Sequence, residues 1–411
     1  MSPLRCRSCG SLRSHPVLDL GIQPLANQLL RPEDLAAEEP RFPLRVSVCQ
    51  DCWLIQITDI VPPAALFTEY LYFSSVSDAL LSHAAAAVEG HRRECALDGC
   101  SFVVEIASND GYLLRNFVAV GVPCLGIEPA RNIAEVAQAR GIPTRNEFFN
   151  ADTARRVRME QGAADLILGN NVFAHVPDTN DFVAGLAALL KPEGRAVLEF
   201  PYACDLIEHV EFDTIYHEHV FYFTLAALEP LFARHGLEVF DVQRLAIHGG
   251  SLRLSTARAG VHAVRDSVRQ LREEERTKGV QSTPYYDAFA ARVLGLKERL
   301  LGLLERLRGE GHRLCAYGAS AKGSTLLNFY GLGRDGLDWL DFVVDRSPAK
   351  QGRLTPGSHL PILPVEALMT QRPRHALLLT WNFADEILSQ QQAWRDAGGR
   401  FIVPLPEVRL L

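Results

Sequence analysis

Two Cys-x-x-Cys pairs stand near the start of the chain, Cys6 with Cys9 and Cys49 with Cys52. Two thiolates two residues apart can bind one metal ion from a tight turn, and two such pairs complete a tetrahedron around Zn²⁺. Four cysteine ligands leave no open coordination position, so the pattern predicts a structural zinc ion and not a catalytic one. The stretch between the pairs is longer than in a usual zinc ribbon, and four unliganded core cysteines are the alternative.

Ionisable and aromatic residues are concentrated between residues 212 and 223, where Tyr216, His217, Glu218 and His219 follow one another. A histidine with a pKa of about 6.5 can act as a general base at neutral pH. Tyr216 could donate a hydrogen bond to an oxyanion, and Glu218 could orient the histidine or contact a substrate. Buried aromatic residues with hydrogen-bonded histidines are the structural alternative.

Small and acidic residues follow the apolar run 102–106, which we expect to be a strand. Small residues at the carboxyl end of a strand let a ligand approach the backbone. The Gly-x-Gly-x-x-Gly of a dinucleotide fold is missing and acidic groups flank the turn, so the loop suits a cationic or zwitterionic ligand better than a pyrophosphate. The candidate ligand-binding residues of this turn are Glu105, Ala107, Ser108, Asn109 and Gly111.

The next predicted strand, 124–127, ends in Glu128 and Pro129, and a carboxylate there can bind both hydroxyls of a ribose. Together the two turns resemble those of class I S-adenosylmethionine (AdoMet) methyltransferases. By this resemblance Phe148 would lie against adenine, and Asn170 and Asn171 would lie beside the methyl donor. An unliganded α/β turn is the alternative.

Further residues could line a substrate site. His175 lies just past the methyl-donor loop, and Tyr70 lies in an aromatic run that could equally be an interdomain plug. A small-residue loop with one lysine follows a predicted strand near 313–317, and a helix N-terminus of this kind favours phosphate, although the spacing is not that of a Walker loop. The candidate substrate-binding residues are Tyr222, His248, Gly250, Ser251, Gly318, Ser320 and Lys322.

Short apolar runs alternate with helical stretches from residue 101 onward, which predicts βαβ units and a mostly parallel sheet. Apolar residues recur at helical spacing over about 283–309, which predicts one long helix, and the βαβ alternation restarts near residue 312. We therefore expect an α/β protein with a Cys₄ zinc-binding domain at 1–66, a methyltransferase-like doubly wound domain at 67–245 and a Rossmann-like α/β domain at 246–411.

Composition narrows the classes of partner. The chain has 411 residues, enough for two or three domains, and carries 42 Lys+Arg against 49 Asp+Glu, a net charge of −7. This balance argues against a nucleic-acid or anionic-membrane partner, because both need a broad basic face. The sequence has no apolar run long enough to span a bilayer and no apolar signal core after Met1, so we expect a cytoplasmic protein without a membrane partner.

The motifs, in chain order, resemble those of the sugar-nucleotide C-methyltransferases of antibiotic deoxysugar pathways, and the resemblance runs from Cys6 to about Pro404. It implies AdoMet as cofactor, structural Zn²⁺, and a dTDP-4-keto-deoxysugar whose C3 is methylated. It also implies His219 as the base, with Tyr70, His175, Tyr216 and Glu218 around the sugar. The motifs are Cys-x-x-Cys twice, Tyr-x-Tyr-Phe-Ser-Ser, Glu-x-x-x-Asn-Asp-Gly, Gly-Ile-Glu-Pro, Tyr-His-Glu-His, His-Gly-Gly-Ser and Tyr-Gly-Ala-x-Ala-Lys-Gly.

The implied chemistry is reasonable for these residues. A 4-keto group acidifies the neighbouring C–H, so a base can form an enolate whose carbon attacks the sulfonium methyl, without a redox cofactor or a catalytic metal. The alternatives are methylation of C5 or of a hydroxyl on the same class of substrate, an NAD(P)-dependent sugar-nucleotide oxidoreductase, and a zinc-ribbon nucleic-acid-binding protein. We expect a monomer, because three domains already enclose a cleft.

Overall fold

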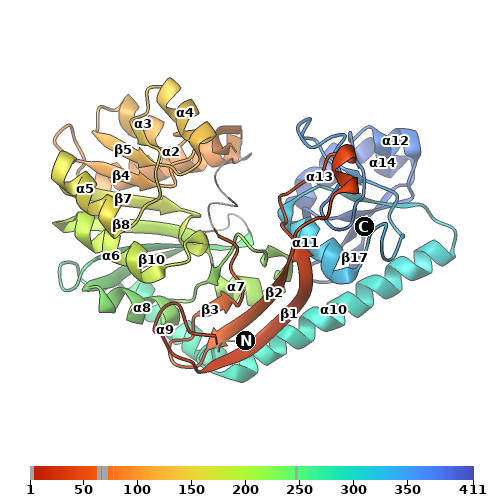
Figure 1. The fold of residues 1–411 in the computed structure, drawn as a ribbon, viewed down its shortest axis with the longest axis horizontal. Coiled ribbons are helices and arrows are strands. Elements are labelled where there is room, and N and C mark those ends of the chain that lie inside the picture. The colour runs from red at the N-terminus through yellow and green to blue at the C-terminus, as the bar shows by residue number, and fades with distance from the viewer. Residues whose placement is uncertain (1–3, 63–65, 67–72, 77, 246–248) are drawn as a thin grey trace.

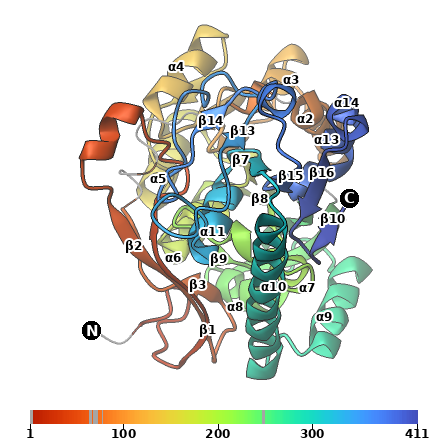
Figure 2. The same ribbon diagram turned by 90° about the vertical axis from the view of Figure 1, so that its right-hand side faces the viewer.

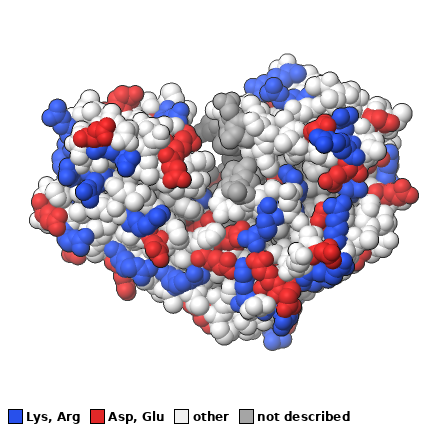
Figure 3. Space-filling model, turned by 180° about the vertical axis from the view of Figure 1, so that it is seen from behind, with Lys and Arg blue, Asp and Glu red and all other residues white. Residues whose placement is uncertain are grey.

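The computed structural model describes residues 4–62, 66, 73–76, 78–245 and 249–411, and three β-sheets organise them. Figure 1 shows two α/β lobes, joined on their lower side by the N-terminal strands and one long helix. Seen from behind, the surface is hollowed between the lobes, and basic and acidic side chains are interspersed on this face (Figure 3). Among the described residues, no helix combines the length and the apolar character needed to cross a membrane.

The first sheet has four antiparallel strands in the order β1-β2-β3-β9. Three of its strands come from the N-terminal domain: β1 (Ser14–Pro24), β2 (Arg41–Cys49) and β3 (Ile55–Ile57). The fourth, β9 (Phe221–Tyr222), follows the Tyr-His-Glu-His sequence directly and pairs Tyr222 with Ile55. The N-terminal domain and the candidate catalytic loop therefore share one sheet.

The second sheet has seven strands in the order β10-β11-β8-β7-β4-β5-β6. The five strands β4, β5, β6, β7 and β8 run parallel to one another, and β11 runs antiparallel to both of its neighbours. Because β4 lies between β5 and β7, the order reverses there, and such switch points are where α/β sheets bind ligands. The strands are β4 (Val103–Ile106), β5 (Cys124–Ile127), β6 (Thr144–Arg145), β7 (Ala164–Asn170), β8 (Leu190–Pro201), β10 (Leu237–Leu245) and β11 (Ser251–Arg258).

Helices cover both faces of this sheet. Val103 packs in one core with residues of α2, α3 and α4, whereas Val104 packs in another with residues of α5, α6 and α8. Consecutive strand residues point to opposite faces, so a doubly wound sheet needs apolar residues at every position of a central strand. The helices are α2 (Asp78–Glu94), α3 (Leu114–Ala119), α4 (Arg131–Ala139), α5 (Ala151–Gln161), α6 (Thr179–Leu189), α7 (Ala203–Glu208) and α8 (Leu225–Arg234).

The third sheet forms the C-terminal lobe, with strand order β14-β13-β12-β15-β16-β17, parallel except for β17. Its strands are β12 (Leu314–Tyr317), β13 (Val343–Val344), β14 (Ile362–Leu363), β15 (His375–Leu378), β16 (Arg400–Val403) and β17 (Arg409–Leu410). Its helices are α11 (Ala321–Tyr330), α12 (Ala367–Gln371), α13 (Ala384–Gln390) and α14 (Gln392–Asp396).

Two helices, α9 (Asp266–Lys278) and α10 (Thr283–Gly309), connect the lobes. Figures 1 and 2 show α10 as a long straight helix running from the N-terminal strands to the C-terminal lobe. Its buried residues include Phe289, Val293 and Leu296, the helical spacing on which its prediction depended. The boundary expected at 245/246 falls between β10 and β11, neighbours in one sheet, so we propose that the structural boundary lies instead after β11.

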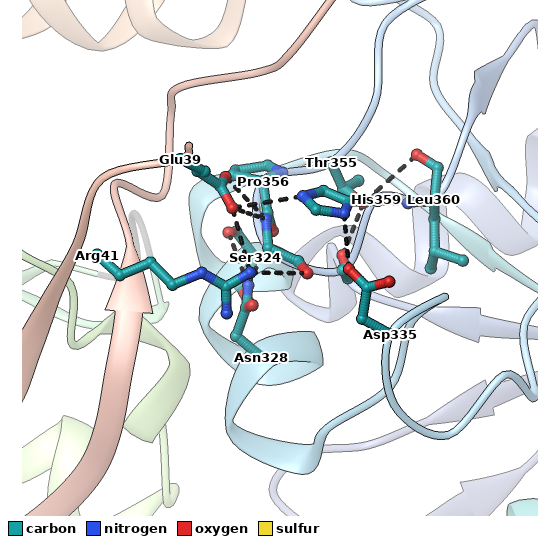
Figure 4. A network of polar contacts seen from close by, with 11 residues as sticks. Glu39, Arg41, Ser324, Asn328, Asp335, Thr355, Pro356, His359 and Leu360 are labelled. Atoms are coloured by element: carbon teal, nitrogen blue, oxygen red, sulfur yellow. Dashed lines mark hydrogen bonds and ion pairs between the residues drawn. The ribbon is translucent and has the colours of Figure 1, made fainter. Parts of the chain in front are cut away.

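A polar network fastens the N-terminal domain to the C-terminal lobe (Figure 4). The Glu39 carboxylate accepts from the backbone N–H of Gly357 at 2.9 Å and lies 3.4 Å from Nε2 of His359. Nδ1 of the same histidine lies 3.0 Å from Oδ2 of Asp335, and Arg41 pairs with Glu39 at 3.3 Å. This network joins the N-terminal domain to the C-terminal lobe, and the pairing of β3 with β9 joins it to the other lobe.

Candidate active site and metal centre

The four N-terminal cysteines converge. The Sγ atoms of Cys6, Cys9, Cys49 and Cys52 all lie within 4.8 Å of one another. The Sγ atoms of Cys6 and Cys52 are 3.5 Å apart, and those of Cys9 and Cys49 are 3.6 Å apart. A tetrahedron with Zn–S bonds of about 2.3 Å has S–S edges of about 3.8 Å, so the cluster has the dimensions of a Cys₄ metal site.

The candidate cofactor loop follows β4 in a conformation with three left-handed residues: Ala107 (φ 54°), Asn109 (φ 49°) and Gly111 (φ 78°). Glu128 holds this loop, because its carboxylate accepts from the backbone N–H of Asn109 at 2.9 Å and from that of Ala130 at 2.8 Å. The turns after β4 and β5 are therefore fastened together at the switch point of the sheet.

An acidic group lies beneath this loop. Glu105 is 1% exposed, and its Oε2 has no hydrogen-bond partner among the described residues. Burial and the nearby charges of Glu128 and Asp110 raise the pKa of Glu105 well above its usual range. Arg140 pairs with Asp110 at 2.9 Å. A buried carboxyl group without a partner fits a ligand that brings positive charge or hydrogen-bond donors.

The other expected cofactor residues lie along the same edge. Ser108 is fully buried, and its Oγ packs against the backbone of Gly126, so its side chain faces the sheet. Phe148, after β6, is 46% exposed and leaves a ring face open. Asn170 ends β7, and the exposed Asn171 (φ 53°) donates its backbone N–H to the carbonyl of Glu199 at 2.7 Å. Pro129 lies beside Glu128 and accepts from Asn146 at 2.8 Å.

His219 lies in a fixed orientation. Its Nδ1 is 2.8 Å from the backbone carbonyl oxygen of Thr214, which can only accept, so Nδ1 carries the proton. In the neutral ring Nε2 is then an acceptor, and the hydroxyl of Tyr216 lies 3.0 Å from it. The hydrogen bonds thus present Nε2 as the basic atom of the pair.

His175 and Glu218 lie next to this pair. The ring centroid of His175 is 4.9 Å from that of His219, and its Nδ1 is 2.7 Å from the carbonyl oxygen of Glu218. Desolvation lowers the pKa of His175 to about 4, so this ring is neutral at pH 7. Burial raises the pKa of Glu218 to about 7, opposed by a hydrogen bond from Asn27.

Asn27 is a site residue that the sequence does not reveal. It belongs to the N-terminal domain, and its Nδ2 lies 2.6 Å from Oε1 of Glu218, across 191 positions of sequence. No motif surrounds it, and an isolated asparagine carries no signal of a partner so far along the chain. The N-terminal domain therefore reaches the candidate active site with a side chain as well as with β3.

Some of the expected substrate residues lie near the catalytic loop and the start of β11, and the others lie in the loop after β12. Tyr222 is buried in the first sheet, and its hydroxyl donates to the backbone carbonyl of His219 at 3.0 Å. This hydrogen bond fixes the backbone of the catalytic loop. Gly250 (φ 129°) lies against Asp205, where an added Cβ would be 2.4 Å from Oδ2, and the buried Ser251 begins β11. Tyr70 and His248 lie outside the described residues.

The small-residue loop after β12 faces the protein itself. Ser320 caps α11 by accepting from the backbone N–H of Gly323 at 3.0 Å, and Asp345 accepts from that of Ala319 at 2.8 Å. Nζ of Lys322 is buried, 4.7 Å from the centre of the Trp381 ring. Gly318 (φ 93°) packs against Thr380. The loop amide of Ala319 is therefore bound by a protein carboxylate, whereas Nζ of Lys322 has no hydrogen-bond partner among the described residues and lies against the Trp381 ring.

Comparisons with known proteins agree with this architecture. Residues 82–242 match a model described as "Methyltransferase domain", residues 246–406 one described as "C-methyltransferase C-terminal domain", and residues 6–67 one described as "Putative zinc binding domain". Fold and domain order thus define a methyltransferase with a Cys₄ N-terminal domain. The chain is also 38% identical over 407 residues to C-methyltransferase NovU of Streptomyces niveus, covering 99% of this chain and 96% of that one. It therefore belongs to the C-methyltransferase family.

Other similarities cover smaller parts of the chain. Ubiquinone biosynthesis O-methyltransferase of Bartonella bacilliformis is 28% identical over 93 residues, which are 22% of this chain and 38% of that protein. The solved structure of magnesium protoporphyrin IX methyltransferase from Synechocystis with bound SAH is 13% identical, with a TM-score of 0.35, covering 44% of this chain and 83% of that one. A SAM-dependent methyltransferase from Anabaena variabilis is 18% identical, with a TM-score of 0.34, covering 43% and 84%.

Proposed function

We propose that the protein transfers the methyl group of AdoMet to C3 of a dTDP-linked 4-keto-deoxysugar, through an enolate. The observation that carries the proposal is the His219–Tyr216 pair, which offers a basic ring nitrogen next to a phenol at 3.0 Å. Removal of a C–H proton next to a ketone needs a base for the proton and a donor for the oxyanion. Membership of the C-methyltransferase family supports carbon as the methyl acceptor.

The residues at the switch point fit AdoMet. Bound there, AdoMet would supply an electrophilic methyl group on a positively charged sulfur. Glu105 offers a buried carboxyl oxygen, Oε2, that has no partner among the described residues, and Glu128 keeps lone pairs for ribose hydroxyls while it holds the loop. The exposed ring of Phe148 offers an apolar face to adenine. In this proposal the acidic surroundings favour the cation over the neutral product.

The proton moves as the hydrogen bonds permit. Nε2 of His219 takes the proton from C3, and the carbonyl of Thr214 stabilises the resulting imidazolium through Nδ1–H. The Tyr216 hydroxyl, released from Nε2, donates to the enolate oxygen. Because His175 stays neutral, it does not oppose the positive charge that develops on the ring 4.9 Å away.

The metal centre takes no part in these steps. Cys6, Cys9, Cys49 and Cys52 would hold Zn²⁺ with all four positions occupied by thiolates, which makes it a structural ion. Its effect on chemistry is indirect, because it fixes the domain that supplies Asn27 and β3 to the catalytic loop.

The test is incubation with a dTDP-4-keto-2,6-dideoxy sugar in D₂O, with and without AdoMet, followed by mass spectrometry and NMR of the product. We expect gain of one deuterium at C3 without AdoMet and a C-linked methyl group with it. A methylated product that keeps the single C3 hydrogen would contradict C3 methylation, and a methyl on oxygen would show O-methylation. Incubation with NAD(P)H in place of AdoMet is the control for oxidoreduction.

A further inference from the structure

Asp213 is a fully buried carboxylate next to the catalytic loop, in the 3₁₀ turn η4 (Phe212–Thr214). The indole Nε1–H of Trp381 donates to its Oδ2 at 2.7 Å, whereas Oδ1 has no hydrogen-bond partner among the described residues. Burial raises the pKa of Asp213, and the charge of Lys322 opposes that rise. A buried carboxyl group is costly without a hydrogen-bond partner, so Asp213 depends on Trp381 of the C-terminal lobe, whose ring lies in turn against Nζ of Lys322.

The turn that Asp213 anchors also fixes the proposed base. Thr214 follows directly, and its carbonyl oxygen holds Nδ1–H of His219 at 2.8 Å. Helix α11 holds the next residue as well, because Oγ1 of Thr325 donates to the carbonyl of Ile215 at 3.1 Å. Phe212 stacks on Tyr330 of α11, with ring centroids 5.6 Å apart. The C-terminal lobe therefore contacts Phe212, Asp213 and Ile215, and the carbonyl of Thr214 among them binds His219.

The small residues of the loop after β12 explain how Lys322 and Trp381 come together. An added Cβ on Gly323 would lie 2.8 Å from Cβ of Leu379, and one on Gly318 would lie 2.5 Å from Cγ2 of Thr380. Only glycines let the start of α11 approach the end of β15 so closely, and Trp381 is the next residue. Nζ of Lys322 then lies 4.7 Å from the centre of the Trp381 ring. The loop has the composition of a phosphate-binding loop, but here it packs one helix against one strand.

We propose that Lys322 and Trp381 are positioning residues, which hold the Asp213 turn so that the Thr214 carbonyl keeps His219 in its Nδ1–H tautomer. The proposal rests on the proposed function of His219 as the base. It replaces the phosphate contact expected for Lys322 with a role inside the protein.

The first measurement needs no sugar substrate. In protein labelled with ¹⁵N-histidine, long-range ¹H–¹⁵N NMR reports which ring nitrogen carries the proton, and a His219→Asn variant identifies His219 among the 13 histidines. We expect the Nδ1–H pattern in the wild-type protein and a mixed or shifted pattern in Lys322→Met and Trp381→Phe. Lys350→Met is the matched control, because Lys350 pairs with Asp345 at 3.6 Å and not with the Asp213 turn. Unchanged His219 signals in both variants would overturn the proposal.

Kinetics separate positioning from substrate binding. We expect both variants to lower kcat at least about tenfold with KM for the sugar nucleotide and AdoMet affinity within about twofold, because a small displacement of a base costs rate and not binding. A raised KM with unchanged kcat in Lys322→Met, and no effect of Trp381→Phe, would assign Lys322 to the phosphate instead. If the wild-type protein fails to methylate the sugar, the proposed function fails, while the NMR result still decides the role of Lys322 and Trp381.

A double variant guards against simple misfolding. Lys322→Met removes the positive charge that opposes the rise in the pKa of the buried Asp213, and this alone could destabilise the turn. Asp213→Asn in the same chain removes the ionisable carboxyl group and keeps an oxygen for the Trp381 N–H. We expect the double variant to regain stability relative to Lys322→Met and to recover part of the His219 tautomer. A double variant less stable than Lys322→Met would contradict a stabilising effect of the Lys322 charge on Asp213.

Discussion

At His219 one ring nitrogen is held by the protein and the other faces a phenol, so the substitution His219→Ala tests the proposed base directly. Loss of a general base lowers rates by about 10²- to 10⁴-fold. We expect methyl transfer and C3 deuterium exchange to fall by that factor, while AdoMet affinity by calorimetry stays within about twofold. His209→Ala is the matched control, because that side chain is half exposed. Lost AdoMet affinity would contradict the assignment.

Glu218 should make folding stability depend on pH. Its pKa of about 7 lies above the usual 4.5 of a glutamate, so the folded protein binds this proton more tightly than the unfolded chain. The stabilisation is full at low pH and is lost as the pH rises to about 7. Glu218→Gln keeps the volume and the oxygen that accepts from Asn27, and it removes the titration. Relative to wild type, the variant should gain about 2 to 3 kcal/mol between pH 5 and pH 8.

Urea unfolding of both proteins at the two pH values measures this difference. Other buried carboxyl groups cancel in the comparison, since both chains keep them. Parallel stability profiles would mean that Glu218 is ionised in the folded protein, and would remove it as a proton-holding group beside His219.

At the scale of elements, the close contact between β5 and the cofactor loop gives a sharp test of the AdoMet site. An added Cβ on Gly126 would lie 2.3 Å from Oγ of Ser108. Gly126→Ala must therefore displace the loop, and we expect a loss of about 1–3 kcal/mol of stability and a weaker AdoMet affinity by about tenfold. Gly302→Ala in α10 is the control: nothing lies within 4 Å of its added Cβ, and a helix gains about 0.5–1 kcal/mol from this change. Unchanged AdoMet affinity in Gly126→Ala would place the cofactor elsewhere.

The elements that the sequence predicts are those whose signal is local. Strand β4 is apolar except for Glu105 because helices cover both of its faces, and α10 appears through its regular apolar spacing. Between the cysteine pairs the sequence is rich in proline and only weakly periodic, and β1 and β2 form there without a clear local signal; β1 contains irregular pairing and two prolines. The two-residue β9 has no pattern of its own and exists because β3 is available to pair with it.

In the candidate site too, the residues that the sequence predicts are those with a local sequence signal. The cysteine cluster and the His219–Tyr216 pair come from residues close together in sequence or repeated as a motif, so residue type and spacing suffice to predict them. Asn27 and Trp381 reach the same loop from 191 and 168 positions away. Lys322 carries a local signal that points to phosphate, and only its surroundings in the fold, above all Trp381, indicate another role.

At the scale of the whole molecule, the metal-binding domain joins the two lobes. It pairs β3 with β9, supplies Asn27 to Glu218, and contacts the C-terminal lobe through Glu39 and Gly357. The cysteine cluster joins the start of this domain to the turn between β2 and β3, since Cys6 and Cys9 precede β1, Cys49 ends β2 and Cys52 precedes β3. Loss of the ion should therefore loosen the whole first sheet, including its edge at the catalytic loop.

We therefore expect removal of Zn²⁺ by a chelator to lower the thermal unfolding temperature and to abolish methyl transfer, while AdoMet binding to the central domain persists. A bound structural ion stabilises the folded state by its binding free energy, and its removal exposes four thiols that a thiol reagent can count. Mass spectrometry measures the metal content, and calorimetry measures AdoMet binding. Hydrogen exchange of residues 214–222 measures the loosening of the catalytic loop. Activity that is retained after the metal is gone, or AdoMet binding lost in parallel with it, would contradict this coupling between the metal centre and the catalytic loop.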